Sequence, residues 1–248
     1  MIKIERVERP NELTDEYVDC KTTDYLTDNN KRVWKLPSIK EKLLEMTNNK
    51  CAYCESRIEL SGSYMEVEHF YPKSIYPQLV LDWDNLLPCC KTCNLKKGDT
   101  DPNDFNLINP TEEDPKNHLI LKRYSIFGET EKGKNTVLKL HLNDMDKMVI
   151  IRARLGEEMI NKLSIIKDQV SEVESYYDEG KITLIRNSII DLLELVQPSK
   201  PYSAVLSSLL KNDNHYLEIK EFLVKYNLWN DGMVNLEAQA EQIALFQS

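Results

Sequence analysis

Two Cys-x-x-Cys pairs in the stretch 51–98 constrain this chain more than any other feature. The first pair is Cys51 and Cys54, and the second is Cys90 and Cys93. In a reducing compartment such pairs indicate metal ligands rather than disulfides. Four thiolates at these spacings predict a closed, tetrahedral zinc site that ties two short segments together. The alternative is four buried free thiols, which pack as small apolar side chains.

The chain has six cysteines, so two lie outside these pairs. Cys89 adjoins the second pair and could replace Cys90 as a ligand, although only Cys90 leaves a two-residue gap before Cys93. Cys20 has no partner at a ligand spacing, and we interpret it as a plain thiol.

Composition limits the class of protein and the kind of partner it needs. The 248 residues are 41% hydrophobic and 29% charged, which is ordinary for a globular chain of one or two domains. Without an apolar run of about 18 residues or a signal-peptide core, we expect a cytoplasmic protein with no membrane contact. The net charge is −9. Because proteins that hold nucleic acid show a basic footprint, such binding here requires a local basic patch or a partner.

The periodicity predicts an α+β fold that is mostly helical. A capping box of Ser38 and Glu41 predicts a helix over 38–47. Two strands joined by a Ser-Gly-Ser turn are expected at 57–60 and 64–70, and a helix over 89–97 that ends at Gly98. Other expected elements are a short strand at 2–7, a loop over 99–118, a strand or hairpin at 119–127 and a short helix over 135–142.

From residue 144 onward the pattern is helical throughout. Apolar residues recur at spacings of three and four in one long helix, and this stripe fits core packing, a coiled-coil seam or a docking face. Further helices are expected near 182–196, 203–211, 216–226 and 236–246. We divide the chain into an N-terminal arm (1–37), a zinc-stabilised core (38–110), a connecting segment (111–143) and a helical region (144–248).

Polar residues of catalytic type lie between and beside the cysteine pairs. Glu68 and His69 end an expected strand, Asn85 follows, and Asn94 comes directly after the last cysteine. The final run has the form Cys-x-x-Cys-Asn-x-x-Lys-Gly. In residue type, order and spacing this stretch resembles the HNH endonucleases, which have a ββα-metal fold.

The resemblance implies a role for each of these residues. His69 would be the general base, since a neutral imidazole with a pKa of about 6.5 accepts a proton from water near neutral pH. Glu68 and Asn94 match the positions that hold a catalytic Mg²⁺ or Mn²⁺. Asn85 matches the middle Asn, which fixes the loop that carries the histidine. The chain departs from many relatives in having Asn94 instead of His, and Glu68 where Asp or His is common.

Each of these residues also has a purely structural interpretation. A single histidine at a strand end is more often structural than catalytic, and an isolated Asn85 would be an ordinary turn residue. Lys73, Lys96 and Lys97 are candidates for phosphate contact, although lysines on exposed turns are usually only solvated.

Three segments, the first of them at the first cysteine pair, resemble one group of HNH proteins. They are Lys50–Glu55 (KCAYCE), Ile108–Pro115 (INPTEEDP) and Lys134–Asn143 (ending LKLHLN). These segments are similar to the HNH subunit of Septu-type anti-phage systems and their retron-associated relatives, in which the nuclease works beside an ABC-type ATPase. The resemblance implies a metal-dependent endonuclease that hydrolyses DNA, with the arm and the helical region as candidate docking surfaces. The alternative is a zinc-stabilised nucleic-acid-binding or adaptor module that does not cleave.

Overall fold

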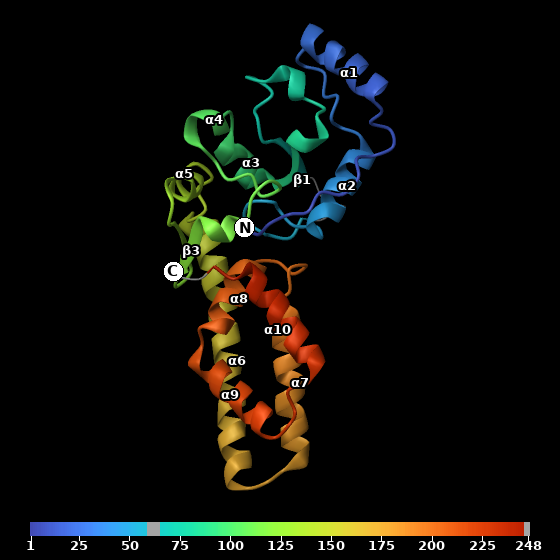
Figure 1. Cartoon of the computed structure of the whole chain (residues 1–248). Coiled ribbons are helices and arrows are strands. Elements are labelled where there is room, and N and C mark those ends of the chain that lie inside the picture. The colour runs from blue at the N-terminus through green and yellow to red at the C-terminus, as the bar shows by residue number, and fades with distance from the viewer. Residues whose placement is uncertain (59–64, 246–248) are drawn as a thin grey trace. The chain divides into compact units, whose positions relative to one another are not determined.

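The computed structural model describes residues 1–58 and 65–245, and the chain divides into two compact units (Figure 1). Unit 1 comprises Met1–Leu119 and Phe127–Leu142, and unit 2 comprises Ile120–Ile126 and Asn143–Ser248. The expected mostly helical α+β fold is confirmed. Within the described residues, no helix combines the length and the apolar character that crossing a membrane requires.

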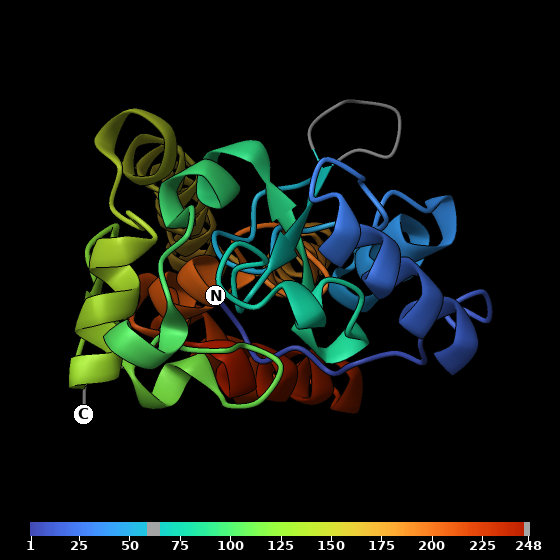
Figure 2. The ribbon, with the colours of Figure 1, turned by 90° about the horizontal axis from the view of Figure 1, so that it is seen from above.

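Unit 1 surrounds a small antiparallel sheet with short helices. Its strands are β1 (Met65–His69) and β2 (Leu86–Cys90), and its helices are α1 (Asp15–Thr27), α2 (Pro37–Thr47), α3 (Lys91–Lys97), α4 (Pro102–Phe105) and α5 (Glu131–Lys139). Three short 3₁₀ helices join them: η1 (Pro77–Leu79), η2 (Trp83–Asn85) and η3 (Pro115–Asn117). Helix α2 packs on β2 and α3 packs on both strands. In Figure 2 the strands are drawn in teal, and the blue helices lie to their right.

The strand pairing differs from the predicted hairpin. Strand β1 pairs with β2, with Met65 opposite Cys90 and His69 opposite Leu86. Arg57, expected in the partner strand, instead forms an isolated bridge with Lys50, and the expected turn lies outside the described residues. The predicted helix over 89–97 is therefore too long at its start: Cys90 ends the strand and caps α3, while Gly98 ends this helix as expected.

The predicted capping box at the start of α2 is wrong. The helix begins at Pro37 with Leu36 as its N-cap, and among the described residues the buried hydroxyl of Ser38 has no hydrogen-bond partner. Proline is favoured at the first helical position because its missing N–H is not needed there and its φ is already helical. This start places Ser38 inside the first turn, where it cannot act as the cap. The other end matches the prediction, since Thr47 is followed by Asn48 in the left-handed conformation.

The structure also tests the expected strand at 2–7, the expected hairpin at 119–127 and the expected helix at 135–142. Residues 2–7 form no strand, although the Ile4 amide donates to the Pro110 carbonyl over 2.8 Å. The expected hairpin near 119–127 is confirmed as β3 (Leu119–Lys122) paired with β4 (Ser125–Gly128). Helix α5 starts four residues before the predicted 135, because the Thr130 hydroxyl accepts from the Gly133 amide and caps it.

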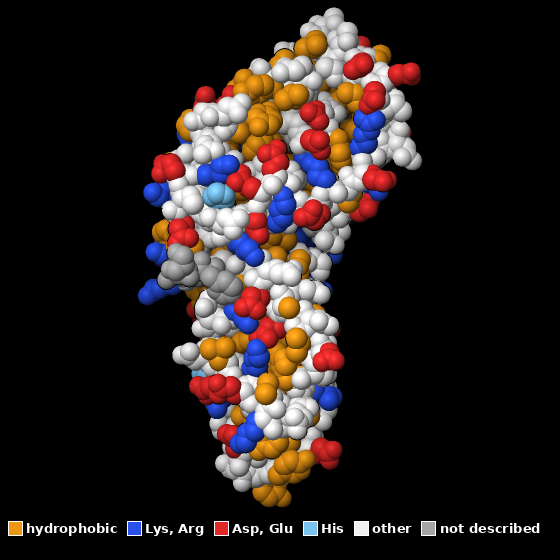
Figure 3. Space-filling model, viewed as in Figure 1, with side chains coloured by type: hydrophobic (Ala, Val, Ile, Leu, Met, Phe, Trp, Pro, Cys, Tyr) orange, Lys and Arg blue, Asp and Glu red, His pale blue; other side chains and the backbone are white. Residues whose placement is uncertain are grey.

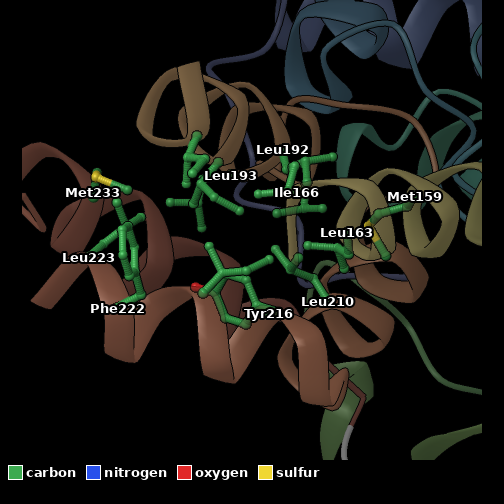
Figure 4. Close-up of a cluster of buried hydrophobic side chains, with 14 of the residues drawn as sticks. Met159, Leu163, Ile166, Leu192, Leu193, Leu210, Tyr216, Phe222, Leu223 and Met233 are labelled. Carbon is green, nitrogen blue, oxygen red and sulfur yellow. The ribbon is translucent and has the colours of Figure 1, made fainter. Parts of the chain in front are cut away.

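Unit 2 is a helical bundle, as its periodicity predicts. After a π-helical turn, η4 (Met145–Val149), come α6 (Ile150–Ser175), α7 (Glu179–Leu195), α8 (Ser203–Lys211), α9 (Asn214–Lys225) and α10 (Asp231–Ile243). The predicted apolar stripe of α6 is buried from Met159 to Val173, which supports core packing. Figure 4 shows this core, where side chains of α6 face those of α7, α8, α9 and α10.

One buried carboxylate joins three helices of the bundle. Glu237 of α10 accepts hydrogen bonds from Tyr216 and Lys220 of α9 and from Lys211 of α8, at 2.6–2.9 Å. Burial raises the pKa of Glu237, but the bonds from Lys220, Lys211 and Tyr216 outweigh it and hold the pKa below its ordinary value. The ionised carboxylate therefore stabilises the bundle.

We expect Glu237→Gln to lower the free energy of unfolding of unit 2 by about 2 kcal/mol, because it leaves two partly buried cations without their charged hydrogen-bond partner. A carboxylate with a lowered pKa stabilises the fold above its unfolded pKa of about 4.3 and loses this effect as the pH falls. The difference between wild type and variant should therefore shrink below about pH 4. Thermal unfolding followed by circular dichroism measures both effects. Glu241→Gln is the control, since its side chain is 58% exposed and lies 3.8 Å from Lys211; an equal loss in both variants would contradict the prediction.

Candidate active site

The two cysteine pairs meet in space. Cys51 and Cys54 lie in the turn after α2, while Cys90 and Cys93 lie at the junction of β2 and α3. Their four sulfur atoms all lie within 4.8 Å of one another. A tetrahedral zinc ion with Zn–S bonds of about 2.3 Å separates its ligands by about 3.8 Å, and the Cys54 and Cys90 sulfurs are 3.8 Å apart. The donor set fits a structural zinc ion, which would tie the segment after α2 to the sheet and α3.

Cys90, and not Cys89, belongs to the four-sulfur group. Cys89 is fully buried, and its Sγ lies 3.8 Å from that of Cys51. Burial raises the pKa of the Cys51 thiol, but hydrogen bonds from the neighbouring cysteines outweigh it and bring the pKa well below its ordinary value. Cys51 is thus favoured as a thiolate, the form that binds a metal. Cys20 is exposed and lies apart from the group.

His69 is buried at the end of β1, with an orientation set by the backbone. Its Nε2 lies 3.0 Å from the carbonyl oxygen of Val80. Because a carbonyl can only accept, Nε2 must carry the proton, and Nδ1 keeps a free lone pair. The ring is 4% exposed, and burial, with a smaller effect of Lys73, lowers the pKa of His69 to about 3. At neutral pH the imidazole is therefore uncharged.

Glu68 lies in a buried ion pair. Its Oε1 accepts from Lys97 Nζ over 2.7 Å and from the Tyr53 hydroxyl over 3.3 Å. Burial raises the pKa of Glu68 to about 7, although Lys97 acts in the opposite direction. Lys97 also donates to the backbone carbonyl of His69 over 3.0 Å and is 1% exposed. Lys97 therefore has no free surface from which to contact phosphate, which differs from the expectation.

Asn94 lies against Glu66 and not against Glu68. Its side-chain amide donates to a carboxylate oxygen of Glu66. Alternate residues of a strand share a face, so Glu66 and Glu68 both face α3, where Asn94 and Lys97 follow one another by a single turn. Sequence reasoning gave Glu66 no role. Its two-residue spacing from Glu68 on a strand, opposite Asn94 and Lys97 at helical spacing, is the signal that could have indicated one.

Asn85 closes the loop between β1 and β2. Its side-chain oxygen accepts from the Tyr71 amide over 2.7 Å, and its amide donates to the carbonyls of Tyr71 and Leu79, each over 3.1 Å. The Phe70 amide donates to the Asn85 carbonyl over 2.9 Å. These bonds fix the start of the loop beside His69.

A second residue missed by sequence reasoning is Trp34, from the segment before α2. Its ring meets that of His69 edge to face, with centroids 5.1 Å apart. Lys73 places its ammonium 5.1 Å from the centre of the Trp34 ring, so this lysine lies beside the histidine. Lys96 is exposed on α3. A tryptophan distant in the sequence from the motif carries no local signal for such a contact.

Comparison with known proteins agrees with this geometry. Residues 51–100 match the family model described as HNH endonuclease, and this range contains β1, β2, α3 and both cysteine pairs. Over its whole length the chain is 39% identical to the Septu protein PtuB of Bacillus thuringiensis, covering 96% of that protein. The chain belongs to the Septu PtuB family. It is also 28% identical to the Septu protein PtuB of Bacillus mycoides (strain KBAB4), over 71% of this chain and 74% of that one.

No solved structure matches the chain. As a PtuB-family protein with an HNH endonuclease domain, it is an enzyme that acts on phosphodiester bonds. The domain match contains every residue of the predicted catalytic and zinc sites, whereas the likeness to PtuB of B. thuringiensis extends through both units.

Proposed function

We propose that this PtuB-family chain is a metal-dependent DNA endonuclease that acts in an anti-phage defence complex with an ABC-type, PtuA-like ATPase. The observation that carries the nuclease chemistry is the bond between His69 Nε2 and the Val80 carbonyl, since it leaves Nδ1 free to accept a proton. His69 then takes a proton from a water molecule as its oxygen bonds to phosphorus and the bond to the departing 3′ oxygen breaks. Asn85 keeps the loop beside the histidine in place.

The residues on the α3 side of β1 fit a divalent cation. Glu66, Glu68 and Asn94 offer carboxylate and amide oxygens, the donors that Mg²⁺ and Mn²⁺ prefer. When bound, such an ion stabilises the negative charge that develops on the phosphate and on the leaving oxygen. Lys97 holds the Glu68 carboxylate in place over 2.7 Å. We assign the catalytic ion to these three residues and the zinc ion to the four cysteines.

Glu66→Gln and Glu68→Gln should each weaken Mn²⁺ binding by about tenfold or more, because an amide replaces a charged ligand. Electron paramagnetic resonance of free Mn²⁺ measures this without requiring cleavage. Glu113→Gln is the matched control, since Glu113 is a partly buried carboxylate of unit 1 that pairs with Lys132 and His118 instead. If both test variants kept the wild-type affinity for Mn²⁺, this face of β1 would be excluded as the metal-binding site.

Plasmid DNA incubated with the chain and Mg²⁺ or Mn²⁺ tests the proposed activity. The assay is run with and without the ATPase and ATP, because the partner is part of the proposal. We expect nicked or linear products in the complete mixture. Absence of cleavage under all of these conditions would favour the alternative of a zinc-stabilised module that binds nucleic acid without cutting it.

The partnership with an ATPase is supported by the net charge and by the surface of unit 2. The chain carries −9, and Figure 3 shows acidic and basic side chains intermixed over the face in view. A partner that binds DNA through its own basic residues would compensate for the negative net charge of this chain. In the turn between α6 and α7, Tyr176 is 81% exposed and Tyr177 is 68% exposed, and aromatic side chains of this kind are common anchors of protein interfaces.

We expect the double variant Tyr176→Ser/Tyr177→Ser to have an affinity for the ATPase that is lower by about tenfold or more, and therefore to co-elute with it more weakly. A chain cut after residue 143 should lose co-elution. Size-exclusion chromatography of co-expressed proteins measures both, and circular dichroism confirms that the double variant is folded. Unchanged co-elution of both chains would exclude the helical region as the docking surface.

A further inference from the structure

A cavity of about 610 Å³ in unit 1 lies beside the proposed metal-binding residues. Glu66 and Asn94 line it, together with Val67 of the same strand. The segment between α1 and α2 and the first turn of α2 also line it. The N-terminal part of the chain thus forms one side of the space in front of the active site.

The cavity is basic although the chain is acidic. Among the described residues that line it, Arg32, Lys35, Lys40 and Lys73 are basic and Glu66 is acidic. Four positive charges and one negative charge leave a local balance of 4 − 1 = +3. A concentration of one sign of charge in a concave site focuses the field and attracts ions of opposite charge, here anions.

The basic residues of the cavity also differ from their neighbours in pairing. Within the described residues, Arg32, Lys35 and Lys40 form no ion pair, whereas Lys31 pairs with Asp24 and Lys42 with Glu45. Cations that are paired have their charge compensated within the protein. The cations of the cavity remain available for an external anion.

Trp34 contacts both the cavity and His69, the proposed general base. The ring lines the cavity and meets His69 at 5.1 Å between centroids, while Tyr25 of α1 supports it from the other side at 5.8 Å. An anion held by the cavity cations would therefore lie beside the Glu66–Asn94 pair, and the Trp34 ring at its edge packs directly on His69. A phosphate of a nucleic-acid backbone is the anion that this position suits.

We infer that the segment 29–40 binds the phosphate backbone of the nucleic-acid strand that enters the active site. Arg32, Lys35 and Lys40 contact backbone phosphates, Lys73 neutralises phosphate charge beside His69, and Trp34 supports this wall. The inference rests on the proposed nuclease function and adds a substrate-binding role for part of the N-terminal arm. This differs from the partner-docking role expected for the arm from the sequence.

The test measures binding of a fluorescein-labelled DNA duplex to the full chain by fluorescence anisotropy, without added divalent ions, at several salt concentrations. We compare Arg32→Ala/Lys40→Ala with Lys31→Ala/Lys42→Ala. Both double variants remove two positive charges from the same region of the sequence, but only the first removes cavity cations. Circular dichroism checks that both are folded.

The cavity variant should bind the duplex at least tenfold more weakly at low salt, and the control should stay within about twofold. Each phosphate contact contributes about 0.9 to the slope of log affinity against log salt, so the cavity variant should lose up to about 1.8. Equal weakening by both variants, no weakening by either, or no binding by the wild type would overturn the inference. Equally effective competition by poly-glutamate would show that the cavity takes acidic protein segments instead.

Cleavage distinguishes a failure of this inference from a failure of the proposed function. If wild-type cleavage depends on His69 while the cavity variant binds like wild type, the nuclease assignment stands and the inference falls. If His69→Ala still cleaves DNA but the cavity variant binds the duplex weakly, the phosphate-binding role of segment 29–40 is supported. In that case His69 is not the general base.

Discussion

Replacing His69 with alanine should lower the rate of phosphodiester cleavage by about 10²–10⁴-fold, the range that a positioned general base contributes. The imidazole is held by the Val80 carbonyl with Nδ1 free, and alanine offers no proton acceptor in its place. A plasmid-nicking time course, with the ATPase and ATP present, measures the rate. Zinc content should stay unchanged, because His69 is not among the clustered cysteine ligands.

His141→Asn is the matched control for the His69 variant. His141 is exposed in unit 1 and has a φ of 50°, a conformation that asparagine tolerates better than most other side chains do. We expect cleavage by this variant to equal that of wild type. A His69→Ala variant that retains the wild-type rate would show that His69 is not the base.

Replacing Cys90 with alanine should abolish zinc binding and unfold the region around β1, β2 and α3. Structural zinc contributes about 10–16 kcal/mol in small zinc-binding peptides, which is comparable to or larger than the net stability of a typical domain. Zinc per chain is measured by mass spectrometry of the metal, and hydrogen exchange of residues 51–98 reports local unfolding. Cys54→Ser should have the same effect, since its sulfur lies 3.8 Å from that of Cys90.

Two other cysteines provide the controls for the zinc site. Cys89→Ala removes a buried sulfur beside Cys51 but leaves the four-sulfur group complete, and Cys20→Ser changes an exposed thiol. Both variants should retain one zinc ion per chain. If Cys89→Ala lost zinc while Cys90→Ala retained it, the result would show that Cys89, and not Cys90, is the zinc ligand.

The four-cysteine group and the bundle helices were predictable because their signals are local. A Cys-x-x-Cys spacing limits which sulfurs can share an ion, whatever surrounds them. The apolar repeat of Met159, Leu163 and Ile166 specifies one buried helix face without knowledge of the neighbouring helices. Helix ends were less predictable: the start of α2 depended on Pro37, which overrode the apparent capping signal of Ser38 and Glu41.

The strand pairing was not predictable from nearby sequence. A short turn favours a hairpin between neighbouring strands, since closing a short loop costs little entropy. Strand β1 pairs instead with β2, beyond the loop that Asn85 braces. This arrangement sets Met65 opposite Cys90, beside the cysteine group.

The sequence by itself determined the family, the two Cys-x-x-Cys pairs, the candidate base and the helical character of residues 150–243, because each depends on residue type and short spacing. Only the tertiary structure decided that Asn94 meets Glu66, that Lys97 is buried against Glu68, and that Trp34 packs on His69. The stretch 51–98 is therefore not the whole active-site region, since the segment before α2 forms one wall of the adjoining cavity. These contacts join residues that are distant in sequence or on different elements, so chain packing, and not local pattern, selects them.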